Sequence, residues 1–350
     1  GMEARLPRVQ RRHKRAALYV LMACAVAVAA FVSYVPPPDP FTIVPRAEMM
    51  PHVNRLPPMR KEFHFCNATH TPREGDVTAV LHFTMDKAEY LTYFAEQWRG
   101  PVSAVVFFRD FEGDAELEKA RLQRWHESFT LVNRYVDIHC VYQNRTRYPA
   151  NLLRNMGVRK ARTDYVLVAD IDLQPSTGAH KLLRAYAEEY IGLPPSAGKL
   201  DKPGIHKKNV LVIPVFNTDA KEQFIPLTKP ELLTNIYHGS AALFRNEGNP
   251  DSARPTQTWA RWLNGTEVYE AQYAWLYQPV VVRHKAAGVY EEQLAGLGPD
   301  TTLFTFMLAA KHYAFQVVPD VFLMHRDHSD GSWLGLGGRR KQIVENLGLA

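Results

Sequence analysis

The chain has 350 residues, a net charge of +6, 46% hydrophobic and 22% charged residues, and three cysteines. This composition is typical of globular proteins and excludes a disordered, collagen-like or coiled-coil chain, while three cysteines are too few for a disulfide scaffold. Residues 1–15 hold six Lys or Arg and one Glu, a local charge of +5, which leaves +1 for the remaining 335 residues. We therefore expect no nucleic-acid partner.

Residues 16–35 are an uncharged, apolar run. A helix of about 20 residues is about 30 Å long, the thickness of a bilayer core. The basic residues 1–15 before it predict a cytoplasmic tail under the positive-inside rule. A cleaved signal peptide is the alternative, although its apolar region is usually about 7–15 residues long. We predict a transmembrane signal anchor that places the rest of the chain in the lumen.

Residues 36–60 contain eight of the chain's 24 prolines. Proline lacks a backbone N–H and fixes its own φ angle, so we predict a semi-extended stem over residues 36–72, followed by a folded domain at 73–350. A basic tail, a membrane anchor, a stem and a lumenal domain are the plan of a single-pass type II Golgi membrane protein.

Three Asn-x-Thr sequons fit a lumenal domain; they begin at Asn67, Asn144 and Asn264. Each triplet alone is a weak signal, because such triplets also occur by chance. In an oxidising lumen Cys66 and Cys140 either form a disulfide or remain two free buried thiols.

From residue 76 the chain alternates between short apolar runs and helical patterns. The predicted strands are 76–83, 102–108, 136–141, 165–169, 210–215 and 315–322, and the predicted helices are 87–98, 115–128, 151–162, 178–190 and 301–311. Strands separated by helices predict an α/β fold with a mostly parallel sheet that is covered on both faces. Neither a G-x-G-x-x-G motif nor a P-loop follows the first strand, so dinucleotide and P-loop sites are not expected.

Asp170 and Asp172 flank Ile171 directly after the strand predicted at 165–169. Open α/β sheets bind ligands at the carboxyl ends of their strands. Two carboxylates there can hold a hard divalent cation and leave positions open for phosphate oxygens and water. Two alternatives stay open: a pair of solvated turn carboxylates, and an aspartyl-nucleophile phosphatase, although that class normally has Thr or Val where this chain has Gln174.

The sequence blocks around this motif resemble glycosyltransferase family 49, which includes the glucuronyltransferase half of LARGE-type enzymes and a β-1,4-glucuronyltransferase. The resemblance covers about residues 76–328. Its ordered blocks are Asp76-Val-Thr with Met85-Asp86, residues 148–155, residues 164–176, Val210 with Ile213-Pro214-Val215-Phe216, Gln278-Pro279-Val280-Val281-Val282, Tyr290-Glu291-Glu292, Gly296-Leu297-Gly298 and Phe322-Leu323-Met324-His325.

The resemblance implies a GT-A fold, a nucleotide-sugar-binding domain whose members invert the anomeric centre of a UDP-sugar. It implies that Asp170 and Asp172 are the metal pair, with Asp172 the direct ligand. His325 corresponds to the third protein ligand, and His328 is a second candidate. Two carboxylates, an imidazole and diphosphate oxygens suit Mn²⁺, with Mg²⁺ as the alternative cofactor.

Two groups of residues are candidates for binding the donor beside Asp170. The first group is Asn151, Arg154 and Asn155, which lie at i, i+3 and i+4 and therefore share one helix face. An Arg on this face can bind a carboxylate or hydroxyls of the sugar. A helix-surface Arg with structural Asn residues is the alternative. The second group is His82, Thr84 and Asp86, which end the first strand, where a GT-A fold binds uracil and ribose.

Inverting transfer needs a base near the acceptor hydroxyl, usually Asp or Glu. Glu291 and Glu292 stand in the place of an Asp-Glu pair of the family, and we rank Glu292 first because it matches the family's Glu. The chain departs from the family at Pro299-Asp300-Thr301, where a basic residue is lost, so Asp300 is another candidate. Alternatively, the three acids only stabilise the start of the helix at 301–311.

These observations predict a metal-dependent inverting glycosyltransferase that moves a sugar, by resemblance glucuronate, from a UDP-sugar to a glycan or glycoprotein acceptor. The alternative is a catalytically silent GT-A domain that binds glycans or organises other enzymes. Besides donor, acceptor and membrane, a second copy of the chain is a candidate partner.

Overall fold

The structure is a computed structural model that describes residues 60–109, 114–143, 148–192, 207–218, 224–244, 259–294 and 300–326. All of them belong to the compact unit Ile43–Ala350, the second of two units in the chain. The predicted tail, the predicted anchor and most of the predicted stem lie outside the described residues. Within the described part of the chain, no helix is long and apolar enough to cross a membrane.

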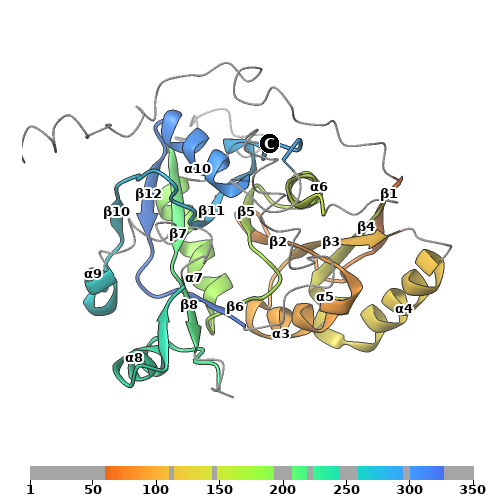
Figure 1. The fold of residues 1–350 in the computed structure, drawn as a ribbon, viewed down its shortest axis with the longest axis horizontal. Helices are drawn as coiled ribbons and strands as arrows, with labels where there is room; N and C mark the ends of the chain where they lie inside the picture. The colour runs from red at the N-terminus through yellow and green to blue at the C-terminus, as the bar shows by residue number, and fades with distance from the viewer. Residues whose placement is uncertain are drawn as a thin grey trace, which may run out of the picture. The chain divides into compact units, whose positions relative to one another are not determined.

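A nine-stranded sheet with the order β1-β4-β3-β2-β5-β11-β7-β12-β10 forms the centre of this unit (Figure 1). Its strands are β1 (Arg60–Cys66), β2 (Val77–Phe83), β3 (Val102–Arg109), β4 (Val136–Gln143), β5 (Tyr165–Val168), β7 (Asn209–Ile213), β10 (Tyr269–Ala271), β11 (Val280–His284) and β12 (Ala314–Val317). The neighbours β4, β3, β2 and β5 are parallel, and a helix lies in each connection between them. This part confirms the predicted alternation of strand and helix.

The sheet is mixed, whereas the sequence analysis predicted a mostly parallel one. Four of its eight neighbouring pairs are antiparallel, namely β1·β4, β5·β11, β11·β7 and β12·β10. A strand that is buried on both faces is a continuous apolar run whatever its direction. The run Val280-Val281-Val282 therefore indicates a buried strand but does not show that β11 runs against its neighbours.

The sheet begins at residue 60, inside the region predicted as stem. Strand β1 pairs antiparallel with β4, with Arg60 opposite Tyr142 and Glu62 opposite Cys140. Most of its side chains are exposed or half-buried, as in other edge strands that carry charged residues. Because such a strand is polar, its sequence does not differ clearly from that of a spacer. In this structure Cys66 and Cys140 are both buried and free.

Helices cover both faces of the large sheet. Side chains alternate along β2, so Ala79 and Leu81 join one core with α3 (Ala88–Trp98) and α7 (Ala179–Tyr186), and Val80 joins another with α6 (Ala150–Lys160) and α10 (Asp300–Ala310). Helix α6 lies very close to β2, since a Cβ atom on Gly157 would be 2.4 Å from Val80 Cγ1. A larger residue at this position would force the Val80 side chain to shift.

The remaining helices connect these layers. They are η1 (Met85–Lys87), α4 (Asp114–Ser128), α5 (Thr130–Tyr135), the π-helical η2 (Ala187–Ile191) that continues α7, α8 (Lys229–Tyr237), α9 (Trp259–Asn264) and η4 (Lys285–Ala287). The helices predicted at 87–98, 115–128 and 151–162 correspond to α3, α4 and α6, with ends that differ by at most two residues.

A second sheet of four strands has the order β6-β13-β8-β9, and its strands are β6 (Leu173–Pro175), β8 (Val215–Thr218), β9 (Ala241–Leu243) and β13 (Leu323–His325). The strand predicted at 210–215 divides at Pro214 into β7 and β8, and the one predicted at 315–322 ends early as β12, before Pro319. Proline has no backbone N–H to donate to a strand pairing, so both segments leave the large sheet at these points. They meet again as the parallel pair β8·β13.

Candidate active site

The ends of β2 and β5 bring His82 and Asp170 together. The two strands are parallel, Val80 is opposite Val168, and the Ala169 N–H donates to the Val80 carbonyl. Two residues further along both strands, His82 Nε2 is 3.6 Å from Asp170 Oδ1. The Asp-Ile-Asp motif therefore lies at the carboxyl end of the parallel strands, as predicted.

Asp170 is held by a buried arginine of α6. Arg154 Nη2 donates to Asp170 Oδ1 at 3.0 Å, and its Nη1 donates to the Asn151 carboxamide oxygen at 3.0 Å. The Arg154 side chain is 8% exposed, whereas that of Asp170 is 55% exposed. The buried Arg154 guanidinium thus holds the Asp170 carboxylate at the surface of the site.

The second sheet brings His325 to Asp172. Asp172 immediately precedes β6, whose Leu173 is opposite His325 of β13, and the Arg326 N–H donates to the Asp172 carbonyl at 2.9 Å. As a result, His325 Nε2 is 3.7 Å from Asp172 Oδ2, with both side chains about one-fifth exposed. These are two of the three predicted metal ligands, and 153 positions of sequence separate them.

The third predicted ligand, Asp170, faces Arg154 and His82 instead. Within the described residues, no three His, Cys, Asp or Glu side chains are grouped closely enough to hold a metal ion. His328, the second histidine candidate, lies outside the described residues. The structure therefore assembles the Asp172–His325 pair and places Asp170 beside a cation.

His82 is buried between Tyr148 and Asp170. Its Nδ1 shares a 2.8 Å hydrogen bond with the Tyr148 hydroxyl, and its Nε2 has no hydrogen-bond partner among the described residues. Burial, together with the nearby Arg154 charge, lowers the pKa of His82 to about 4 and outweighs the opposite effect of the carboxylates. His82 is therefore neutral at physiological pH.

Thr84 and Asp86 follow β2 at the turn η1. The Thr84 hydroxyl donates to the Asp86 carboxylate, and Asp86 is exposed. These two donor candidates therefore lie at the same edge of the sheet as His82, and they interact with each other.

The amides of Asn151 and Asn155 bind the segment 290–292 rather than facing an open site. Asn151 Nδ2 donates to the Glu291 carbonyl at 2.9 Å. Asn155 Nδ2 donates to the Tyr290 carbonyl at 2.8 Å, and its Oδ1 accepts the Tyr290 N–H at 2.9 Å. Both asparagines are almost fully buried. Of the predicted donor face of this helix, only Arg154 reaches Asp170.

The three base candidates differ in their surroundings. Glu292 Oε1 accepts from Asn155 Nδ2 at 2.9 Å and from Arg159 Nη1 at 3.2 Å. Glu291 Oε1 accepts the Gln293 N–H at 3.2 Å, within its own turn. Asp300 is the first residue of α10, and its side chain lies outside the described part of the structure. Only Asp300, therefore, is in the first turn of that helix.

Sequence reasoning missed the residues that fix this segment. Tyr290 is buried and stacks on Phe304 of α10, with 4.2 Å between ring centroids. Arg283 is fully buried, and its guanidinium lies 4.7 Å from the Phe304 ring and 5.8 Å from the Tyr290 ring. Arg159 binds Glu292. In the sequence, the sign of this cluster is Arg283, a charged residue that directly follows the apolar run Val280-Val281-Val282 of β11.

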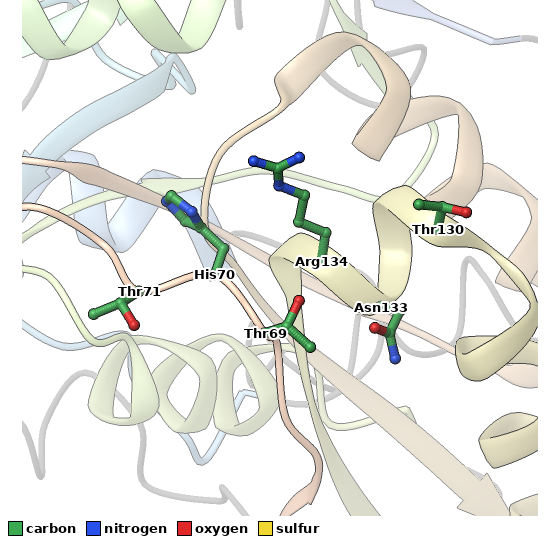
Figure 2. Close-up of a pocket in the computed structure, with 6 residues that line it drawn as sticks. All are labelled: Thr69, His70, Thr71, Thr130, Asn133 and Arg134. Atoms are coloured by element: carbon green, nitrogen blue, oxygen red, sulfur yellow. The ribbon is translucent and has the colours of Figure 1, made fainter.

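A hollow of about 400 Å³ lies at the opposite end of the sheet, and Figure 2 shows the six residues that line it. It lies between the segment after β1 and helix α5, which directly precedes β4, and therefore faces the amino ends of the parallel strands. It is lined by Thr69, His70, Thr71, Thr130, Asn133 and Arg134. None of the predicted site residues lines it.

Comparison with known proteins identifies the class of the chain. A family model described as "Glycosyl-transferase for dystroglycan" matches residues 142–330, more than half of the chain. The protein belongs to this family, which confirms the resemblance to glycosyltransferase family 49. The matched region contains Asp170, Asp172, Glu292 and His325.

The chain is 29% identical over 261 residues to glycosyltransferase-like protein gnt14 of Dictyostelium discoideum, covering 74% of this chain and 38% of that protein. It is 31% identical over 258 residues to xylosyl- and glucuronyltransferase LARGE2 of Homo sapiens, covering 74% of this chain and 34% of that protein. The chain thus spans between 34% and 38% of these relatives. S. aureus TarS 1-349 in complex with UDP-GlcNAc has a TM-score of 0.39 at 12% identity, covering 76% of this chain and 64% of that chain.

Proposed function

We propose that this protein is a metal-dependent inverting glycosyltransferase of the GT-A type. It moves a sugar, by resemblance glucuronate, from a UDP-sugar to a glycan acceptor. The observation that carries the proposal is the proximity of Asp172 and His325 at the carboxyl end of the parallel strands. Family membership and relatives named xylosyl- and glucuronyltransferases support sugar transfer.

The Asp172–His325 pair has the chemistry of metal ligands. Two donor atoms that each lie about 2.1–2.2 Å from one ion, at right angles, are roughly 3 Å apart. The observed 3.7 Å between Asp172 Oδ2 and His325 Nε2 is longer than this value, so binding one ion would draw the two side chains closer together. These two residues would hold Mn²⁺ or Mg²⁺, while the Asp170 carboxylate is paired with Arg154. A bound ion supplies positive charge that stabilises the diphosphate as it leaves.

The donor lies along the ends of β2 and β5 in this proposal. Arg154 binds Asp170 and keeps a cation at the position where a charged donor arrives. The neutral His82, whose Nε2 is otherwise unpartnered among the described residues, adds a polar atom beside Asp170. Thr84 and Asp86, at the next turn, are where we place the uracil and ribose.

Glu292 is the proposed base. The acceptor hydroxyl oxygen forms the new bond to C1 of the donor sugar, and its proton passes to the Glu292 carboxylate. The bond between C1 and the diphosphate oxygen breaks, and its electron pair leaves with UDP. Attack from the face opposite to UDP inverts the anomeric centre. The products are the extended glycan and UDP.

A donor screen tests this proposal. The purified lumenal region is incubated with Mn²⁺ and either UDP-glucuronate, UDP-xylose or UDP-GlcNAc, with a panel of aryl xylosides and glucuronides, and UDP release is measured. We expect release with at least one donor, loss of release in EDTA, and recovery when Mn²⁺ is restored. Full activity in EDTA would contradict the metal mechanism. Tight UDP binding without transfer to any acceptor would instead favour the silent-domain alternative.

We also propose that the domain is lumenal, on a single-pass type II Golgi membrane protein. The apolar run at 16–35 with its basic flank supports this topology. Asn67 and Asn264, which begin two of the sequons, are exposed in the structure. In intact microsomes the domain should resist added protease, and at least one sequon should carry glycan. Digestion without detergent, or a mature N-terminus near residues 30–36, would contradict this topology.

A further inference from the structure

We propose that Asn155 and Arg159 of α6 are positioning residues that orient the Glu292 carboxylate toward the sugar acceptor. The inference rests on the proposed transferase function and extends it to the acceptor side of the site. It gives Asn155 a role different from donor binding, and it gives Arg159 a role for the first time.

The two oxygens of the Glu292 carboxylate have different surroundings. Oε1 is held by two donors, Asn155 Nδ2 at 2.9 Å and Arg159 Nη1 at 3.2 Å. No hydrogen bond to Oε2 is found among the described residues, and the side chain is 38% exposed. One oxygen is therefore fixed by the protein while the other is available to accept a proton from a bound hydroxyl. A positioned base has this arrangement.

The backbone that carries Glu292 is fixed as firmly as its side chain. Asn155 makes two reciprocal hydrogen bonds with the backbone of Tyr290, and the Tyr290 ring is packed on Phe304. Asn151 holds the Glu291 carbonyl. Glu291, in contrast, directs Oε1 to the Gln293 N–H in the same turn. The geometry thus favours Glu292 over its neighbour as the group that faces the acceptor.

Helix α6 also contacts the donor side of the proposed site, through Arg154. Arg154, one position before Asn155, binds Asp170 at 3.0 Å and Asn151 at 3.0 Å. Helix α6 thus connects a carboxylate of the Asp-Ile-Asp motif to the segment 290–292 through side chains that are almost fully buried. Because a helix is rigid, α6 sets the spacing between donor and base. Misplacement of a reacting group by about 1 Å can cost about 100-fold in rate.

Arg159→Gln is the first test, because Arg159 is half exposed and its loss should not unfold the protein. We expect kcat for transfer from UDP-glucuronate to an aryl xyloside to fall roughly 3- to 10-fold, with the Kd for UDP unchanged by calorimetry. Arg159→Lys should restore most of the lost turnover, since it keeps a cation near Oε1. Arg121→Gln, an exposed arginine of α4, is the matched control and should behave as wild type.

Asn155→Asp keeps the acceptor for the Tyr290 N–H but replaces the donor to Glu292 and to the Tyr290 carbonyl with a negative charge. We expect a larger fall, about 10- to 100-fold in kcat. In a Glu292→Gln background, Arg159→Gln should cost nothing further, because the group that it orients is gone. Wild-type kcat in Arg159→Gln, or additive losses in the double variant, would overturn the positioning role alone. A wild-type chain that transfers no sugar would overturn both this role and the proposed function.

Discussion

Asp170 and Asp172 are separated by one residue, yet two differently built regions of the molecule hold them. Asp170 follows the parallel unit β2–β3–β4–β5, and its partners Arg154 and His82 precede it by 16 and 88 positions. Asp172 precedes the small second sheet, and its partner His325 comes from the far end of the chain. In the proposed mechanism the two regions have different roles: the first orients charge, and the second supplies the metal ligands.

Asp172→Asn should have the largest effect, because it removes a ligand charge while keeping the size of the side chain. We expect transfer to fall to background in an assay of UDP release with Mn²⁺, while the circular dichroism spectrum and melting temperature stay close to those of wild type. Asp164→Asn, in the loop before β5, is the matched control and should keep activity. Full activity in Asp172→Asn would show that the second region does not supply the ligands.

Glu292→Gln is expected to lower turnover about 10²- to 10⁴-fold, the usual contribution of a general base. The affinity for UDP should change little, because Glu292 is held by α6 and not by the metal pair. Turnover and calorimetric Kd are measured for Glu292→Gln, Glu291→Gln and Asp300→Asn. If only Asp300→Asn loses turnover, the base is Asp300 and our ranking is wrong.

Arg154→Gln tests the first region. Loss of a charge-assisted hydrogen bond is worth about 1.5–3 kcal/mol, or roughly 10- to 100-fold. We expect this loss mainly in KM for the UDP-sugar, with a smaller change in kcat. Because Arg154 is buried, thermal unfolding is measured alongside. A selective fall in kcat would instead place Arg154 on the acceptor side.

The smallest effect concerns stability, at a position away from the site residues of both regions. His139 of β4 is fully buried, its Nδ1 accepts the His64 N–H, and burial lowers its pKa to about 3. Below the ordinary pKa of about 6.5, the unfolded state binds a proton that the folded state excludes, so stability falls with decreasing pH. This should cost about 1.6 kcal/mol between pH 6.5 and 5. His139→Asn should show a correspondingly flatter pH dependence in urea unfolding; an unchanged slope would refute the assignment.

The first region was largely predictable from sequence, because each strand and helix is local. The apolar runs of β2, β3 and β5 and the helical pattern of α6 predict that Asp170 directly follows a buried strand of an α/β unit. The pairing of Asp172 with His325 could be expected only from the family resemblance, since it depends on β6 and β13 meeting in a second sheet. The contacts of Asn155 and Arg159 with Glu292 could not be predicted, because they depend on how α6 packs against a loop more than 130 residues away.

Manganese binding tests the central claim, that Asp172 and His325 together form the ligand pair of the site. Mn²⁺ is titrated in the presence of UDP and followed by electron paramagnetic resonance for the wild type, Asp172→Asn, His325→Ala and the exposed control His238→Ala. We predict one site in the wild type and in His238→Ala, and affinity at least about tenfold weaker in each of the other two variants. Unchanged Mn²⁺ affinity in both Asp172→Asn and His325→Ala would contradict the account.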